Sequence, residues 1–386
     1  MALLLAGPAA AWAETDEELL EAFSAAVSSA PEQPSDSSSG FRSTALNLMN
    51  PAISFIADAA VSVGDGNPVV DQFSTDHDPV KNGFTLQQIE LSVQSPVDPY
   101  LEYFMAMVFT LEGFEIEEAY GTTRALPAGL QSRFGKVKWA AGRENATHLH
   151  SWSFGKASLL RSGLLGAESL SSLGVELSWL TPLPFYDTLQ AVAADQAAAD
   201  ELADELGLAP TTAPTGPGGW FRRQFYLLRN EASFTPMDAL AGNVGVWAAQ
   251  SGPSFARLQW LGADLYAKWR SRKNNEEGRY LALTVEAAGR RAQTPANGKL
   301  DIAGYELVDI HFAQRWLGSL RHEWLHQRSQ GEALTQRSGL AIAFRPSEFS
   351  KFRIEGFESH SPAGHEGWTV DLGFELVAGA HGAHSF

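Results

Sequence analysis

The sequence predicts an all-β protein, a transmembrane antiparallel up-and-down β-barrel of about 16 strands, with about 14 as the alternative count. Three observations favour this fold class. Long segments alternate apolar and polar residues, short and long connections alternate along the chain, and no apolar run of about 18 residues occurs beyond the start. A barrel escapes a search for apolar helices because its lipid-facing residues alternate with polar ones.

The clearest alternation lies near the end of the chain. From Trp368 to Ala380 the even positions are all apolar, and the odd positions are mostly polar or small. A period of two over about a dozen residues exceeds the usual globular strand of about 5–6 residues and suits a bilayer crossing of about 9–11 residues. The alternative is an edge strand of a soluble sandwich.

The same texture begins after Pro51. In the first predicted strand Ile53 and Phe55 share one face, whereas Ser54 and Asp58 share the other. The predicted strands span residues 52–64, 84–95, 99–111, 114–123, 130–142, 171–181, 184–195, 221–233, 239–250, 256–270, 278–291, 302–314, 316–326, 334–345, 350–360 and 367–380.

The connections carry a second signal. Every second connection is short and rich in Pro, Gly and Asn, as in Pro96-Val97-Asp98 and Pro182-Leu183. The others include the three longest, 65–83, 143–170 and 196–220. Outer-membrane barrels have short periplasmic turns and longer outside loops. We therefore expect an even strand count, pairing of the first strand with the last, and both termini on the periplasmic side.

Three segments divide the chain. Residues 1–13 form an apolar run ending in Ala11-Trp12-Ala13, which is typical of a signal peptide, although a buried N-terminal helix is an alternative. Residues 14–50 predict a short periplasmic helix followed by a polar linker. Residues 51–386 are expected to form the outer-membrane barrel.

Composition excludes several function classes. The net charge of −17 argues against a nucleic-acid partner, whose phosphates require basic patches. The absence of cysteine excludes disulfides and thiolate metal sites. We expect no enzyme, because neither a glycine-rich phosphate loop nor a G-x-S-x-G nucleophile motif occurs.

Charged strand residues are expected to face water, because Arg or Lys on the lipid face costs about 2–4 kcal/mol near the bilayer midplane. Sixteen strands would leave an aqueous channel, and a salt-bridged wall without an open path is the alternative. The excess of acids predicts a modest cation preference. Lys136 and Lys138 are expected to pair with Glu118 across strands. The expected pore-lining residues are Asp58, Glu90, Glu102, Glu118, Lys136, Lys138, Glu176, Asp264, Lys268, Arg270, Glu286, Asp309, Arg321, Glu323, Arg353, Glu355 and Asp371.

Aromatic residues gather near the predicted strand ends. They predict the interfacial girdles of a membrane barrel, and ordinary core packing is the alternative. These residues are Tyr100, Trp139, Trp179, Phe185, Trp260, Trp269, Tyr280, Trp316 and Trp368.

Several segments carry a family resemblance. They are Asn50-Pro51-Ala52-Ile53-Ser54, Ser95-Pro96-Val97-Asp98-Pro99-Tyr100, Glu117-Glu118-Ala119-Tyr120, Leu126-Pro127-Ala128-Gly129-Leu130, Asn145-Ala146-Thr147-His148-Leu149-His150, Pro346-Ser347-Glu348-Phe349-Ser350 and the last eight residues, from Gly379 to Phe386. From about residue 48 onward the chain resembles Gram-negative outer-membrane barrels that are often labelled zinc-regulated TonB-dependent receptors. The chain has room for neither a plug domain nor the about 22 strands of such receptors, so we expect a plug-less, porin-like form.

Histidines suggest a metal ligand set. His148 and His150 lie two apart in one long loop, and Asp76-His77-Asp78 lies in another. Imidazole and carboxylate suit Zn²⁺, so a zinc site is a hypothesis, and ordinary loop histidines are the alternative.

The sequence thus predicts a porin-like channel in the outer membrane of a Gram-negative bacterium, passing small polar solutes or ions. The alternative is a zinc-linked uptake protein or a structural surface barrel with a closed lumen. Expected partners are outer-membrane lipid, the barrel assembly machinery and further copies of the chain. The resemblance implies that the terminal Phe386 serves as the assembly signal.

Overall fold

The computed structural model describes residues 51–65, 68–75, 77–79, 82–166, 169–205, 224–251, 257–270, 279–293, 298–330, 333–361 and 366–379. The chain divides into two compact units, residues 1–50 and 51–386, and every described strand belongs to the second. The expected signal peptide, the N-terminal helix with its linker, and Phe386 lie outside the described residues.

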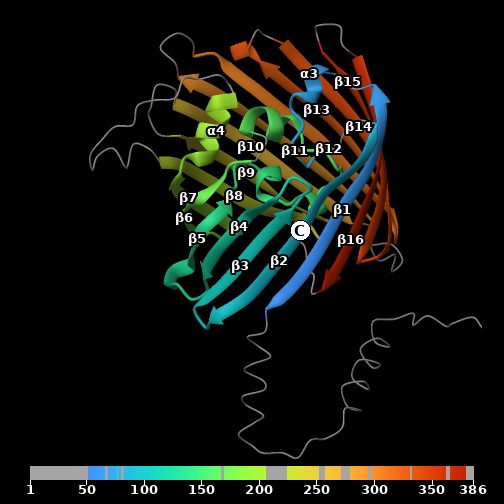
Figure 1. Cartoon of the computed structure of the whole chain (residues 1–386). Coiled ribbons are helices and arrows are strands. Elements are labelled where there is room, and N and C mark those ends of the chain that lie inside the picture. Colours follow the sequence, from blue (N-terminus) through green and yellow to red (C-terminus); the bar gives the residue numbers. More distant parts are fainter. Residues whose placement is uncertain are drawn as a thin grey trace, which may run out of the picture. The chain divides into compact units, whose positions relative to one another are not determined.

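Sixteen antiparallel strands close into a barrel (Figure 1). Each strand pairs with its neighbours along the chain, and β1 pairs with β16, so that Ser54 lies opposite Gly379. The predicted fold class, strand number and closure are therefore confirmed. None of the helices in the described part of the chain is long and apolar enough to cross a membrane.

The strands are β1 (Ala52–Asp65), β2 (Gly83–Asp98), β3 (Leu101–Phe109), β4 (Phe114–Thr123), β5 (Leu130–Lys138), β6 (Ser171–Leu180), β7 (Asp187–Asp195), β8 (Gln224–Met237), β9 (Leu240–Gln250), β10 (Arg257–Arg270), β11 (Tyr280–Gln293), β12 (Leu300–Ala313), β13 (Trp316–Gln327), β14 (Ala333–Ser347), β15 (Ser350–His360) and β16 (Glu366–Gly379). The helical segments are α3 (Pro68–Asp71), α4 (Ala197–Glu205), η1 (Pro127–Gly129), η2 (Glu144–Ala146), η3 (Leu149–Ser151), η4 (Arg161–Leu165) and η5 (Arg328–Gln330).

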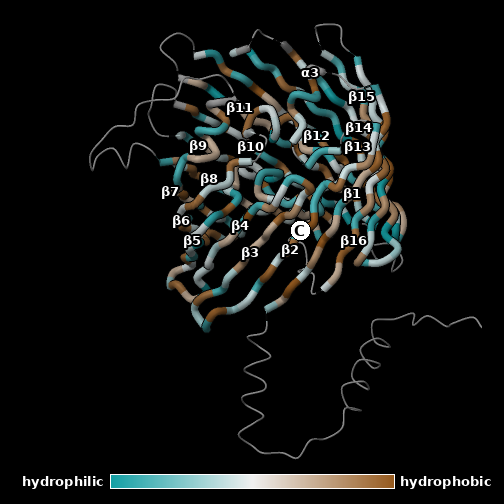
Figure 2. The backbone as a smooth tube through the Cα atoms, in the orientation of Figure 1, coloured by the Kyte–Doolittle hydropathy of each residue, from teal (hydrophilic) through white to brown (hydrophobic). Residues whose placement is uncertain are grey.

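Alternation along the strands separates the two faces of the barrel wall. On β1, Ser54 and Asp58 are buried inside, whereas Phe55 and Val63 are about half exposed on the outside. Figure 2 shows the same change between hydrophobic and hydrophilic residues along many strands. Side chains of successive residues point to opposite faces of a sheet, so a sequence that alternates apolar and polar residues gives an apolar outer face and a polar inner face.

Apart from register shifts next to the short turns, β-bulges on β2 and β4 interrupt this alternation. The register with β1 shifts at Gln87 on β2, and the register with β3 shifts at Glu117 on β4. Each bulge places two successive side chains on the inner side, so Gln87 and Gln88 are both buried, as are Glu117 and Glu118. A bulge inserts one extra residue and redirects the side chains around it.

The connection from β5 to β6, residues 139–170, folds into the barrel (Figure 1). Leu159, Leu160, Leu164 and Leu165 of this connection are fully buried against apolar side chains of the wall. The sequence predicted an aqueous channel inside the barrel, but the interior of the described residues contains an apolar core. The reason is that this connection brings its own leucines inside, where they remove apolar surface from water.

The apolar core also corrects part of the girdle prediction. Trp139 and Trp260 are buried in the core, and Tyr280 lines an interior cavity. The outward positions at the strand ends are held by the other predicted aromatics, Tyr100, Trp179, Phe185, Trp269, Trp316 and Trp368, all of which are exposed. Aromatic character alone does not distinguish a girdle residue from a residue that packs under an inward-folded loop.

Candidate functional site at the inward-folded connection

Acidic residues of the wall hold the backbone of the β5–β6 connection. Leu159 N donates to Glu323 Oε2 at 2.7 Å, and Gly155 N donates to Glu355 Oε2 at 2.9 Å. Arg143 N donates to Glu286 Oε2 at 3.1 Å. Buried N–H groups need acceptors, and these carboxylates supply them from strands β11, β13 and β15.

Arginines of the same wall hold the carbonyl groups of the connection. Both terminal nitrogens of Arg321 donate to Lys156 O at 3.0 Å, and Arg337 donates to Ala157 O. Arg290 donates to Leu164 O at 3.0 Å. Arg321 on β13 and Arg337 on β14 also form ion pairs with Glu323. The same two side chains therefore neutralise a buried carboxylate and donate hydrogen bonds to backbone carbonyl groups of the connection.

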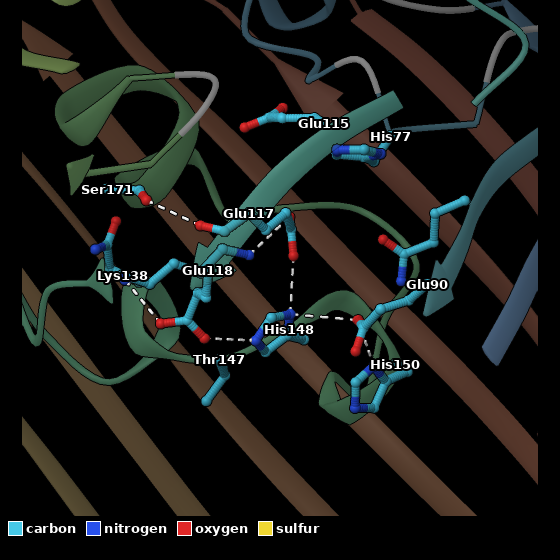
Figure 3. A network of polar contacts seen from close by, with 12 residues as sticks. His77, Glu90, Glu115, Glu117, Glu118, Lys138, Thr147, His148, His150 and Ser171 are labelled. Atoms are coloured by element: carbon cyan, nitrogen blue, oxygen red, sulfur yellow. Dashed lines mark hydrogen bonds and ion pairs between the residues drawn. The ribbon is translucent and has the colours of Figure 1, made fainter. Parts of the chain in front are cut away.

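The opposite wall holds the connection through histidine side chains (Figure 3). His148 Nδ1 lies 2.8 Å from Glu117 Oε2 and 3.3 Å from Glu90 Oε2. His148 Nε2 lies 2.9 Å from Glu118 Oε2. His150 Nδ1 lies 3.2 Å from Glu90 Oε2, and its ring stacks on that of His148 with centroids 5.7 Å apart. Three carboxylates therefore converge on one imidazole.

Lys138 positions two of these carboxylates. Its Nζ donates to Glu117 Oε1 at 2.8 Å, and its backbone N donates to Glu118 Oε1 at 2.9 Å. The bulge on β4 makes this possible, because regular alternation would send one of the two adjacent glutamates outward. We name the group of Glu90, Glu117, Glu118, His148 and His150 the His–Glu cluster.

The charges of the His–Glu cluster act on His148, which lies in the connection. Burial and the neighbouring Lys138 ammonium lower the pKa of His148. The carboxylates of Glu90, Glu117 and Glu118 outweigh both effects and raise the pKa of His148 well above its ordinary value.

A polar cavity of about 200 Å³ lies at the barrel end away from the long connections. Ser153 and Phe154 of the connection form one side of it, and Tyr266, Tyr280 and Arg345 contribute to the wall side. Lys156, two residues beyond Phe154, lines a second cavity of about 570 Å³ at the other end of the barrel. The segment 153–156 therefore contributes side chains to two separate cavities.

Most expected pore-lining residues lie on the inner face but are engaged in pairs. Lys156 pairs with Asp371, Ser153 donates to Asp309 and Gln88 donates to Asp58. On the wall itself Arg133 pairs with Glu176, Arg229 with Asp264, Arg353 with Glu355, and Gln94 hydrogen-bonds Glu102. The Lys268 ammonium lies 4.1 Å above the Tyr280 ring, and Arg270 is exposed at the strand end.

The predicted pore-lining position of Lys136 does not fit the phase of β5, whereas Lys138 is buried and its ammonium lies among the carboxylates of the His–Glu cluster. Both share the β5 face of Phe134, whose ring is exposed, while Val137 on the opposite face is buried in the interior core. Lys136 instead pairs with Glu115, and the partner of the Lys138 ammonium is Glu117 rather than Glu118. Val137 packs in the apolar core inside this wall. The β5 residues that face inward are therefore those that alternate with Lys136, the opposite of the prediction.

The lysines lie at a seam of the wall. The register between β4 and β5 covers only residues 119–122 on β4, so the rest of β4 separates from β5. Side chains replace the missing ladder: Lys136 Nζ donates to Ile116 O at 2.6 Å, and Ser171 Oγ donates to Glu117 O at 3.3 Å. Backbone groups without ladder partners need such substitutes.

The structure brings together only two of the predicted metal ligands. His148 and His150 come together as expected, but their companions are Glu90 and Glu117. His77 instead contacts Gln87 O at 3.0 Å, Asp78 accepts from Ala157 N, and Asp76 lies outside the described residues. Sequence reasoning missed Glu117, although two successive glutamates in an alternating strand were a signal for a bulge.

The sequence also contains a second pattern that is typical of metal sites. His322-Glu323-Trp324-Leu325-His326 matches the H-E-x-x-H pattern, which binds zinc when a helix places both histidines on one face. Here the segment lies on strand β13, where Glu323 is buried inside and His322 is exposed outside. Four residues along a strand separate the two histidines by about 13 Å, which is too far for one ion.

Comparisons with known proteins place the fold. No protein-family model matches the chain. An uncharacterized protein of Aquifex aeolicus is 42% identical over 106 residues, a stretch that spans 28% of this chain and only 22% of that protein's length.

Among solved structures, OprB from Pseudomonas putida is similar with a TM-score of 0.57 and 10% identity, covering 88% of this chain and 97% of that chain. The anion-selective porin from Comamonas acidovorans has a TM-score of 0.56 and 10% identity, covering 85% and 99%. The channel DcaP of Acinetobacter baumannii has a TM-score of 0.52 and 11% identity, covering 86% and 97%. At such identities the likeness shows the barrel fold alone.

The label of zinc-regulated TonB-dependent receptor gains no support from these comparisons. The described barrel has sixteen strands, whereas plugged outer-membrane transporters have about 22. Two of the similar solved barrels carry a porin or channel name.

Proposed function

We propose that this chain is a porin-like channel of the Gram-negative outer membrane, with both termini on the periplasmic side, passing small polar solutes or ions. The observation that carries the proposal is a closed sixteen-stranded barrel with an apolar outer face and two cavities to which the segment 153–156 contributes side chains. The β5–β6 connection then forms the constriction, and the expected pore-lining charges tune passage at its rims.

The cavity of about 200 Å³, called the inner cavity from here on, suggests which ions the channel would prefer. Its lining includes Arg143, Arg321 and Arg345 against two acids, Glu144 and Asp309. Glu144 also accepts a hydrogen bond from Ser158 N, and Asp309 accepts from Ser153 and Ser319. We expect this cavity to favour small anions locally, in contrast to the cation preference expected from composition.

The experiment is conductance in a planar bilayer combined with a single engineered cysteine, which the cysteine-free chain permits. Stepwise conductance is expected, and a thiol-reactive anion should block the Ser153→Cys variant because Ser153 lines the cavity of about 200 Å³. The matched control is Ser347→Cys at the exposed β14–β15 turn, where labelling should leave conductance unchanged. Wild-type protein that is folded and inserted but gives no steps would refute the channel.

One observation favours a second function. The apolar core around Leu159, Leu164 and Trp247 occupies part of the interior and would obstruct water. A surface barrel with a closed lumen fits that core. Absence of conductance in the same bilayer experiment would select this alternative. Copies of the chain and the barrel assembly machinery remain proposed partners.

A further inference from the structure

We propose that Glu90, Glu117 and His148 bind a divalent transition-metal cation, which fixes the β5–β6 connection to strands β2 and β4. The proposal goes beyond the channel and does not depend on conduction. The three ligand atoms, one from each residue, lie within 4.8 Å of one another (Figure 3). They come from two strands and the connection, so an ion there would join three parts of the barrel.

The spacing suits a tetrahedral ion. Ligand atoms at about 2.0–2.2 Å from zinc lie roughly 3.3–3.6 Å from one another. The separation of His148 Nδ1 and Glu90 Oε2 is already 3.3 Å, and that of Nδ1 and Glu117 Oε2 is 2.8 Å. Binding needs Glu117 to move away from Nδ1 by about half an ångström, and the separation of the Glu90 and Glu117 ligand oxygens, at most 4.8 Å, to come to about 3.3–3.6 Å.

A second observation is the contact on the far nitrogen of His148. Nε2 lies 2.9 Å from Glu118 Oε2, the arrangement in which a metal-bound histidine donates its other N–H to a carboxylate. With the proton on Nε2, the lone pair of Nδ1 and the two carboxylate oxygens that it faces can bind one cation together. A divalent cation satisfies all three atoms at once, whereas one proton on Nδ1 can be donated fully to only one of the two oxygens.

The remaining contacts orient the ligands. Lys138 Nζ holds the second oxygen of Glu117, and Lys138 N holds that of Glu118. His150 Nδ1 lies beside Glu90 Oε2 and orients that carboxylate. Such outer contacts fix first-shell ligands in metal sites.

Charge favours the same occupant. Glu90, Glu117 and Glu118 are 2%, 8% and 6% exposed, and the cations beside these three buried carboxylates are the Lys138 ammonium and the His148 ring when it is protonated, one positive charge fewer than the carboxylates. Uncompensated buried charge is costly, which makes a divalent cation favourable here. A mixture of imidazole and carboxylate ligands suits Zn²⁺ and its first-row neighbours better than Ca²⁺ or Mg²⁺, which take oxygen ligands.

The test uses the folded full chain in detergent, freed of metal by a chelator and titrated with Zn²⁺ in a calorimeter. We expect one saturable site in the wild type and its loss in His148→Ala. Glu118→Gln, which keeps the shape of the side chain, should weaken binding about 10- to 100-fold. The matched control His322→Ala removes an exposed histidine of β13 and should bind as the wild type does.

Two further readouts keep the proposal testable if His148→Ala fails to fold. Co²⁺ bound to the wild type should show the visible absorption of a tetrahedral site, which Glu117→Gln should weaken. Zn²⁺ should also slow amide hydrogen exchange over residues 139–166, since the ion fixes this connection. A wild type without saturable binding, or binding unchanged in Glu117→Gln and Glu118→Gln, would overturn the site. Binding without slower exchange would overturn its role in fixing the connection.

Discussion

The two walls that hold the β5–β6 connection are built differently. The wall of β13 and β14 pairs in register along the whole of Trp316–Gln327, and its buried arginines and Glu323 bind the backbone of the connection. The wall of β2, β4 and β5 has two bulges and an incomplete β4–β5 ladder, and it holds the connection through histidine side chains. The regular wall of β13 and β14 thus suits stable attachment of the β5–β6 connection, whereas the irregular wall of β2, β4 and β5 positions the His–Glu cluster.

The largest effect is expected on the regular wall. Glu323→Gln leaves Arg321 and Arg337 buried without their shared carboxylate. Breaking a buried charge pair by removing one partner costs about 3–5 kcal/mol, and the amide retains part of the hydrogen bonding, so we expect a loss of about 3 kcal/mol in the free energy of unfolding. Urea unfolding of the refolded barrel measures it. A loss below about 1 kcal/mol would show that this wall does not dominate the attachment.

A smaller effect is expected where the connection enters the barrel. Gly142 has a φ of +89°, and a Cβ there would lie 1.7 Å from Glu286 Oε1. Gly142→Ala should therefore cost about 1–3 kcal/mol through backbone strain and displacement of the carboxylate that binds Arg143 N.

The control for this variant is Gly113→Ala, because a Cβ at Gly113 meets nothing within 4 Å. Its unfolding curve should overlay that of the wild type, or nearly so. Equal losses in the two glycine variants would mean that the contact with Glu286 does not set the cost, since Gly→Ala at an unstrained position lowers the entropy of the unfolded chain and does not destabilise by itself.

The contrast between the walls also explains what the sequence could predict. The alternation along many segments and the alternation of short and long connections gave the strand count and the closure. Strict period two in β1 and β16 gave the inward position of Asp58 and Asp371, because period two is a local property. The His–Glu cluster depends on a bulge at Glu117, and the partners of His148 lie about 30 positions away or more. Such contacts follow from how the connection folds inward, which no local pattern contains.

The phase of β5 shows the same limit from the opposite direction. Charge placed Lys136 inside, but Val137 faces the interior because the leucines of the connection make that interior apolar. The identity of the inner surface therefore depends on a segment more than ten residues further along the chain. Sequence patterns describe a strand, whereas the environment of its faces is set by the tertiary fold.

The smallest effect is expected at the seam of the irregular wall. Lys136 and Glu115 form an ion pair of 3.1 Å in which the side chains are 33% and 47% exposed. Solvent screens such pairs, so Glu115→Gln should cost less than about 1 kcal/mol, and the difference from wild type should shrink further in high salt. The Lys136 contact with Ile116 O persists in this variant, which keeps the backbone carbonyl satisfied. Urea unfolding at low and high salt provides the measurement. A loss as large as that of Glu323→Gln would place the seam among the main stabilising contacts of the barrel and would remove the contrast between the two walls.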